Sequence, residues 1–199
     1  PRDLRVTSHG TTATIRAVDS IAAPFASDLA LSIVLDNSGS MFHTYDSLTR
    51  MCDTLIDSLD PGAVGQVVLF DTRPRTPGHL FTRRTGVYIA PTGFTDTLAR
   101  LKQYWHFYDT IKVGYTPLFD AIALSLEKIS DRRLGEELTP SIHRSDVLLA
   151  ITDGGDNASR TDLSSLIELA TSAHIRLFAI SFRGEIDHRL ALLARRSGG

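Results

Sequence analysis

The stretch that decides the fold is LALSIVLDNSGSM, residues 29–41, in which an apolar run ends abruptly in small polar residues. Residues 29–35 are almost continuously apolar, which is typical of a strand that is buried on both faces of a parallel sheet. Similar runs lie at 64–70 and 147–151, and a fourth strand is expected at 175–182. The sequence therefore predicts a sheet with a buried, parallel centre.

Helices are expected between these strands. Apolar residues spaced by three and four positions, as on one face of a helix, run from Leu48 to Leu59 and stop at Asp60-Pro61-Gly62. The same spacing predicts further helices at 95–107, at 118–129 after Pro117, at 163–169 and at 186–195. Strands that alternate with helices require crossover connections. The predicted fold class is therefore α/β, with a mostly parallel central sheet and helices on both faces.

The first 28 residues lie outside this pattern. Apolar and polar residues alternate within 4–17, which predicts a hairpin or two short strands. We expect residues 1–28 to be an extension or the end of a preceding module, and residues 29–199 to form the domain proper. A fold of this class would have one more strand after the last residue, and a short strand at its edge is expected at 87–90.

Composition and charge narrow the class of protein. The chain has 199 residues, 42% of them apolar, which allows a large core and excludes a disordered chain. The formal net charge of −2 provides no positive field for nucleic acid. The single cysteine, Cys52, excludes a disulfide framework and a cysteine zinc site, and its place in a helical apolar stripe predicts a core residue. No apolar run reaches membrane-spanning length, so we expect no direct membrane insertion.

Carboxylates and hydroxyls gather where the predicted strands end, at the edge where open α/β sheets bind their ligands. They are Asp36, Ser38, Ser40, Thr116 and Asp153. Oxygen ligands of this kind suit Mg²⁺ or Mn²⁺, are also compatible with Ca²⁺, and do not suit zinc or copper. Two carboxylates neutralise a divalent ion, and the hydroxyls add ligands without charge. A coordination position left to water could accept a carboxylate from a protein partner, which predicts a receptor for an acidic residue.

Each of these residues also has a purely structural interpretation. Asn, Ser and Gly favour a strand-to-helix turn, and Ser40 could cap the helix that follows. Thr116 before Pro117 has the form of an N-cap, and Asp153-Gly154 that of a turn. All of these explanations would have to coincide at one edge of the sheet, which favours the metal site.

Other residues near these segments are expected to be structural or exposed. Asp156 and Asn157 are expected to face solvent or to cap a helix, and His43 to be a bystander at the rim. Core packing is expected for the aromatic run Tyr104, Trp105, Phe107 and Tyr108, any exposed member of which would contact a partner. A solvated surface is expected for Arg73, Arg75, Arg83 and Arg84.

The polar segments resemble the site loops of von Willebrand factor A (vWA) domains. Leu-Asp-Asn-Ser-Gly-Ser-Met at 35–41 is similar to their DxSxS loop, Gly-Tyr-Thr-Pro-Leu at 114–118 to their threonine loop, and Ile-Thr-Asp-Gly at 151–154 to their aspartate loop. The resemblance covers residues 29–196 and implies a Rossmann-like vWA fold. It also implies a metal-ion-dependent adhesion site (MIDAS), whose residues would be Asp36, Ser38, Ser40, Thr116 and Asp153.

The predicted function is a divalent-metal-dependent protein-binding module of the adhesion type, without enzymatic activity. One alternative is a vWA accessory domain that couples a AAA+ ATPase to its target; the ATPase would lie elsewhere, because this chain has no GxxxxGK(S/T) loop. Another is a phosphotransferase of the haloacid-dehalogenase type, which Ser38 disfavours because it stands in place of the second aspartate. A scaffold whose site stays empty is the last alternative. The resemblance favours an extracellular or cell-surface location, as part of a larger protein.

Overall fold

A computed structural model of the chain describes residues 6–8, 11–13, 29–70, 87–89, 93–106, 116–136, 145–182, 184 and 186–199. Near the N-terminus, β1 (Val6–Ser8) and β2 (Thr11–Ala13) form an antiparallel pair, which confirms the predicted hairpin. The assignment of residues 1–28 to an extension or a preceding module remains a prediction.

The centre of the molecule is a sheet with the strand order β5-β4-β3-β6-β7. Its middle strand, β3 (Leu29–Asp36), runs parallel to β4 (Val64–Phe70) on one side and to β6 (Ser145–Thr152) on the other. β7 (Arg176–Ser181) continues the sheet in parallel with β6, and β5 (Val87–Ile89) pairs antiparallel with β4 at the opposite edge. The mostly parallel sheet and the short edge strand predicted from the sequence are confirmed.

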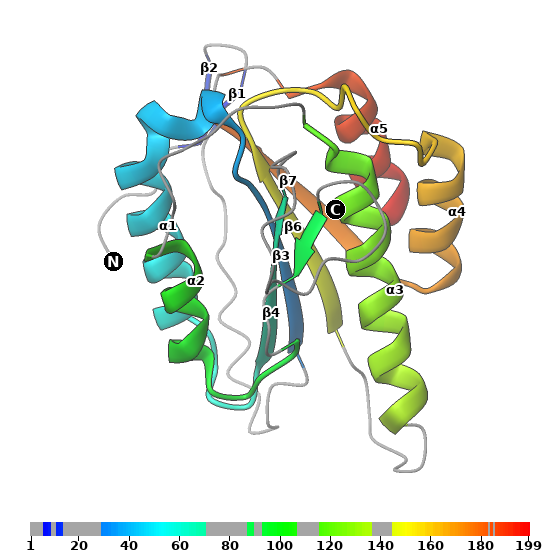
Figure 1. Ribbon diagram of the computed structural model, residues 1–199. Coiled ribbons are helices and arrows are strands. Elements are labelled where there is room, and N and C mark those ends of the chain that lie inside the picture. Colours follow the sequence, from blue (N-terminus) through cyan, green and yellow to red (C-terminus); the bar gives the residue numbers. More distant parts are fainter. Residues whose placement is uncertain are drawn as a thin grey trace, which may run out of the picture.

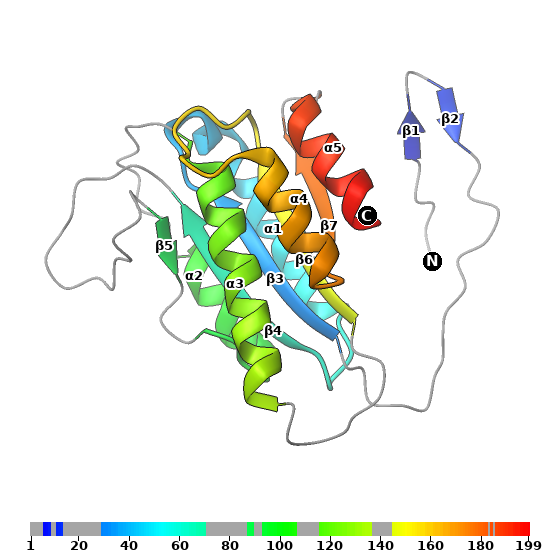
Figure 2. The same cartoon turned by 90° about the vertical axis from the view of Figure 1, so that its right-hand side faces the viewer.

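Helices cover both faces of this sheet (Figure 1). One face carries a 3-10 helix, η1 (Gly39–Thr44), which leads into α1 (Tyr45–Asp57), and a second, η2 (Leu98–Leu101), which leads into α2 (Lys102–His106). The other face carries α3 (Leu118–Glu136), α4 (Leu163–Ser172) and α5 (His188–Ser197), which lie side by side in Figure 2. No helix in the described ranges is long and apolar enough to cross a membrane.

The helix predicted at 95–107 starts later and is irregular. Thr95 forms an isolated antiparallel bridge with Gly65, in which each backbone amide donates to the other residue's carbonyl at 2.9 and 2.8 Å. These bonds hold Thr95 against the sheet, so the helical segment begins only at Leu98, as a 3-10 turn. Leu101 and Trp105 are both fully buried, so the predicted apolar side of this segment faces the core although the regular helix is shorter than expected.

Two apolar cores lie on opposite faces of the sheet. One joins β3 and β4 to α3, α4 and α5, and its buried residues include Phe70, Leu126 and Leu190. The other joins the sheet to α1 and α2, and it includes Cys52 and Trp105. Cys52 is fully buried, and burial raises the pKa of its thiol to about 12, which fits the predicted role as a small core residue.

A buried polar cluster fastens α3 to the sheet. The Ser32 hydroxyl on β3 lies 2.5 Å from the Ser125 hydroxyl on α3, and the Gln66 side-chain amide on β4 donates to Ser32 at 2.9 Å. All three side chains are fully buried. Because a buried polar group needs a hydrogen-bond partner, this cluster fixes the position of α3 along the strands.

Candidate functional site

The first site loop follows β3 at the carboxyl end of the sheet, beside the loop that follows β6 (Figure 1). Asp36 is fully buried, and its Oδ1 accepts a 2.8 Å hydrogen bond from the Ser38 backbone amide. Met41, also fully buried, anchors η1 in the core, and the Thr44 hydroxyl donates to its carbonyl. The loop therefore has a fixed path at the end of the strand.

The loop that follows β6 and begins at Asp153, here called the third loop, contacts the first loop (residues 37–41) through side chains. The Ser40 hydroxyl donates to Asp153 Oδ1 at 2.7 Å, and the Ser38 and Ser40 hydroxyls lie 3.0 Å apart. The Thr152 hydroxyl donates to Asp36 Oδ2 at 2.6 Å. The alternative in which Ser40 caps the next helix is wrong, because neither η1 nor α1 has a side-chain cap and the Ser40 hydroxyl points to Asp153.

Among the candidate ligands, Asp36 has a carboxyl group whose pKa is raised by its surroundings. Removal from water raises the pKa of this carboxyl, and the nearby charge of Asp153 adds to the effect. Hydrogen bonds from Thr152 and Ser38 oppose it by stabilising the carboxylate, without cancelling it. Two carboxylates in one buried place are costly in isolation, and a bound cation would relieve that cost.

Thr116 is joined to the loop after β6 through its backbone. It is 8% exposed and lies just before α3. Its amide donates to Asn157 Oδ1 at 2.7 Å, and its carbonyl accepts from the Asn157 amide at 3.2 Å. Asp156 caps α3 from the third loop, because its Oδ1 accepts from the Phe119 amide. The expected capping role of Asp156 is thus confirmed, whereas Asn157, although exposed, also holds the threonine loop in place.

A second set of bonds, which the sequence analysis did not single out, joins the same two loops. Asp120, in the first turn of α3, is only 3% exposed. Its Oδ1 accepts from the backbone amides of Arg160 and Thr161 and from the Thr161 hydroxyl, at 2.7 to 3.1 Å. The Ser159 hydroxyl accepts from the Asp120 amide. A carboxylate in the first turn of a helix is so common that spacing alone gave no signal of this contact.

α5 holds the third loop from its other side. The Arg189 guanidinium donates to the Asp156 carbonyl at 2.8 Å, pairs with Asp187 at 3.1 Å, and lies 5.0 Å from the centre of the Phe119 ring. Asp187 lies so close to Gly155 that a Cβ there would collide with its carboxylate. The pKa of Asp187 is lowered: partial burial opposes this, but the hydrogen bonds and charge of Arg189 outweigh it.

The remaining predictions near the site divide between described and undescribed residues. His43 is exposed, Trp105 is fully buried and Tyr104 is half-buried against the α1 core, so core packing holds for this part of the aromatic run. The Trp105 indole nitrogen donates to Asp53 at 3.0 Å. Phe107, Tyr108, Tyr115 and the arginines between 73 and 84 lie outside the described residues.

Solved structures share this architecture. An aerotolerance-related membrane protein from Bacteroides fragilis NCTC 9343, in a form with multiple mutations to serine, superposes with a TM-score of 0.56 and 16% identity over 86% of this chain and 89% of its own. Proximal thread matrix protein 1 from the mussel byssus, in a structure with a zinc-occupied MIDAS motif, gives a TM-score of 0.60 and 18% identity over 84% of this chain. The chain has the von Willebrand factor A fold.

This chain corresponds to 41% of the length of the mussel protein. No protein-family model matches the sequence, and neither does any curated protein. At 16% and 18% identity this similarity establishes the fold only. What the chain binds has to be argued from its own residues.

The oxygen donors at this end of the sheet are of the kind that hard divalent cations bind, and their spacing leaves room for adjacent ligand positions. Adjacent ligands of an octahedral Mg²⁺ ion, at about 2.1 Å from the metal, lie about 3.0 Å from each other. The Ser38–Ser40 and Ser40–Asp153 oxygen pairs are 3.0 and 2.7 Å apart. Within the described ranges no group of three or more His, Cys, Asp or Glu side chains could hold a metal, so hydroxyls must complete any such site.

Proposed function

We propose that this vWA domain is a divalent-metal-dependent protein-binding module. The residues that would hold the metal are Asp36, Ser38, Ser40, Thr116 and Asp153. The observation that carries the proposal is that the side-chain oxygens of Ser38, Ser40 and Asp153 meet at the carboxyl end of the sheet, where the charge of Asp153 also acts on the buried Asp36 carboxyl. A bound divalent ion would supply positive charge and a coordination position open to a carboxylate from another protein.

The loops of this chain would prepare that position before a partner arrives. Hydrogen bonds from Thr152 and the Ser38 amide orient the Asp36 carboxylate. Asn157 and Asp156 hold the threonine loop against the third loop. Because the protein groups are already in place, little order has to be gained when metal and partner bind, which supports affinity. We propose Mg²⁺ as the resident ion and Mn²⁺ as its closest substitute.

A thermal melt tests the metal site. Wild-type protein, Asp36→Asn and Asp153→Asn are melted in EDTA and then in increasing Mg²⁺, Mn²⁺, Ca²⁺ or Zn²⁺; zinc is included because it occupies the mussel protein's MIDAS. A ligand of the folded state raises stability by about 1.4 kcal/mol per tenfold increase in concentration above its Kd. For a domain of this size that is about 3–6 °C per decade.

The matched control is Asp131→Asn, an exposed carboxylate in the second half of α3 that pairs only loosely with Lys128. We expect wild type and Asp131→Asn to shift with Mg²⁺, and both site variants to stay flat. Equal shifts in all four proteins would place the metal elsewhere and refute the proposed ligands. No shift with any of the four ions would favour the scaffold interpretation.

We also propose that the domain binds rather than catalyses. Both carboxylate oxygens of Asp36 accept hydrogen bonds, and the side chain is fully buried, which is a poor arrangement for a nucleophile. A generic phosphate ester should not be turned over by wild type. Turnover that Asp36→Asn abolishes would revive the phosphotransferase alternative.

A further inference from the structure

Two neighbouring charged side chains dock the start of α5 on the third loop. Asp187 is the N-cap of α5, and its carboxylate accepts a 2.8 Å hydrogen bond from the Arg189 backbone amide. The same carboxylate fills the place that a side chain at Gly155 would take. The Arg189 guanidinium donates to the Asp156 carbonyl at 2.8 Å. Two consecutive residues of the third loop therefore rest on the start of α5.

The same guanidinium also reaches α3. Its central carbon lies 5.0 Å from the centre of the Phe119 ring, which is almost fully buried in the first turn of α3. The Phe119 backbone amide donates to Asp156 Oδ1 at 3.2 Å. Arg189 thus contacts both members of a hydrogen-bonded pair that joins α3 to the third loop. These members stand three positions after Thr116 and three positions after Asp153, two of the candidate metal ligands.

An arginine suits these partners better than a lysine would. The Nε and Nη2 atoms of Arg189 donate to the two carboxylate oxygens of Asp187 at 3.3 and 3.1 Å, and Nη2 also reaches the Asp156 carbonyl. The rigid fork of donors fixes the guanidinium over the Phe119 ring. A lysine ammonium would keep the charge but has neither the fork nor the planar group. The contacts therefore depend on the type of side chain as well as on its charge.

The position of Asp153 depends on such contacts. Gly154, which follows it, has no atom within 4 Å of the position that a Cβ would take, so this part of the loop has little packing of its own. Losing a contact that orients a metal ligand from outside the coordination shell typically weakens metal binding about 10- to 100-fold. We infer that Arg189 is a positioning residue of the candidate metal site, which sets the affinity for divalent ions by holding the third loop against α3. This inference rests on the proposed function and names what tunes the affinity of that site.

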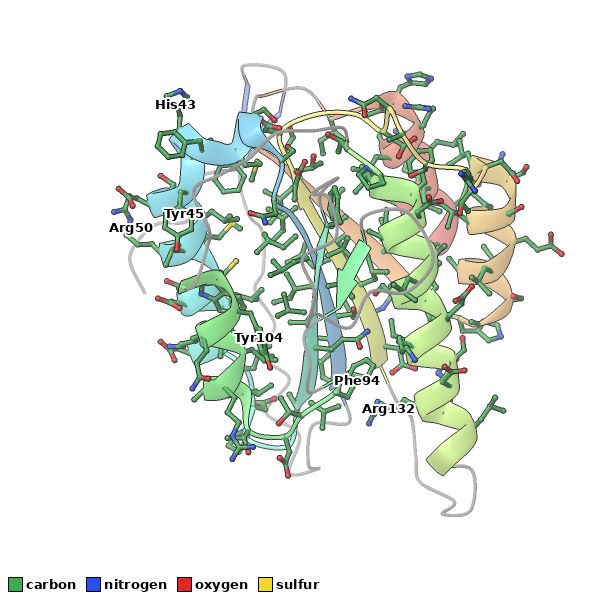
Figure 3. The ribbon with its side chains drawn as sticks, viewed as in Figure 1. His43, Tyr45, Arg50, Phe94, Tyr104 and Arg132 are labelled. Carbon is green, nitrogen blue, oxygen red and sulfur yellow. The ribbon has the colours of Figure 1, made fainter. Side chains whose placement is uncertain are left out.

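Arg132 provides a matched control at the other end of the sheet. Its guanidinium lies 5.3 Å from the centre of the Phe94 ring and 3.7 Å from Asp146, a buried carboxylate near the start of β6. Figure 3 shows Phe94 and Arg132 well away from His43, which lies on η1 beside the first loop. Arg132 thus has the same kinds of partner as Arg189, an aromatic ring and a carboxylate, and neither of these two belongs to a site loop.

Calorimetric titration with Mg²⁺ and urea unfolding in EDTA test the inference on wild type, Arg189→Met and Arg132→Met. Arg189→Met should raise the Kd for Mg²⁺ about tenfold. The sign is informative, because this variant leaves the Asp187 carboxylate without its counter-charge, and an extra negative charge alone would favour cation binding. Arg132→Met should lower the free energy of unfolding and leave the Kd unchanged. Gly155→Ala, whose Cβ displaces the Asp187 carboxylate, perturbs the same contacts from the loop side and should also raise the Kd.

The outcomes separate position, charge and stability. An unchanged or lower Kd in both Arg189→Met and Gly155→Ala would overturn the inference, even if both variants are less stable, because Arg189 would then serve the fold alone. So would an equal rise in Arg132→Met, which would make the Kd a measure of general stability. If Arg189→Met does not fold, Gly155→Ala decides the question. A wild-type protein that binds no Mg²⁺ would refute the proposed metal site itself, and the inference would fall with it.

Discussion

The contact between Asp120 and the third loop offers a direct test of how the site is held together. Asp120 is buried at the start of α3 and accepts bonds from the Arg160 amide, the Thr161 amide and the Thr161 hydroxyl. Removing the side chain leaves three donors without their acceptor. It also unties the loop that carries Asp153 from the helix that follows Thr116.

The magnitude follows from the number and kind of these bonds. Hydrogen bonds to a charged group contribute about 1.5–3 kcal/mol each. Arg160 is exposed and Thr161 is half-buried, so water can replace part of what Asp120→Ala removes, and the lower end applies. Three bonds at that end of the range give an expected loss of about 4.5 kcal/mol in the free energy of unfolding for Asp120→Ala, and hence of about 9–18 °C in its melting temperature. Asp120→Asn keeps an accepting oxygen and should lose less than half of this.

Urea denaturation of wild type, both Asp120 variants and Thr161→Val measures the effect, and a Mg²⁺ titration of each variant measures the site. Thr161→Val removes only the hydroxyl bond and should cost about 1.5 kcal/mol. In Asp120→Ala the Kd for Mg²⁺ should rise, because Thr116 and Asp153 are no longer held in register. An Asp120→Ala variant as stable as wild type would refute this account, as would one that is destabilised but binds Mg²⁺ with unchanged affinity.

Three further predictions concern single side chains. Burial raises the pKa of Asp36, so the metal-free folded state binds its proton more tightly than the unfolded chain does, and stability falls as pH rises through the raised pKa. Lowering the pH from 7 towards 4 in EDTA should therefore stabilise wild type relative to Asp36→Asn. A stability difference between the two proteins that does not change with pH in urea titrations would contradict this. Cys52, buried and with its thiol pKa raised to about 12, should not react with a thiol reagent in the native state, and its labelling rate should follow global unfolding measured in urea. Hydrogen bonds from Ser164 and Ser165 hold the pKa of Asp162, the N-cap of α4, well below its usual value. Its contribution to the stability of the fold is therefore present above the unfolded pKa and is lost in acid. The melting temperature of Asp162→Ala should lie below that of wild type at pH 7, by an amount that shrinks towards pH 2.

The sheet could be predicted from the sequence because its central strands are buried on both faces. Residues 147–151 are continuously apolar and residues 29–35 nearly so for that reason, and the parallel pairing of these strands follows from the helices between them. The place of the candidate site followed from the same logic. Once the strand order is parallel, Asp36 and Asp153 must leave the sheet at the same edge.

What could not be predicted depends on contacts between distant backbone groups. Thr95 looks like the start of a helix until its bridge to Gly65 is seen, and Asp120 looks like an ordinary first-turn carboxylate until the amides of Arg160 and Thr161 are placed beside it. These partners lie 30 to 41 residues apart in the chain. Side-chain spacing within one element carries no information about such pairs, since any polar residue in the right place would serve.

The bonds around the site divide into two kinds, and the difference bears on how the site would respond to metal. The first and third loops meet through the oxygens that would themselves hold the ion, in the pairs Ser38–Ser40 and Ser40–Asp153. The third loop is also bonded to Thr116 and to the first turn of α3, and these bonds use other groups. Asn157 pairs with Thr116, and Thr161 with Asp120. Metal binding would replace the first set of bonds and leave the second intact. Movement on loading should therefore be confined to η1 and Ser40, whereas the unit formed by α3 and the third loop stays fixed. Hydrogen exchange in EDTA and in Mg²⁺ should show altered protection at residues 38–44 and little change at 156–161, and the reverse pattern would contradict this division of roles.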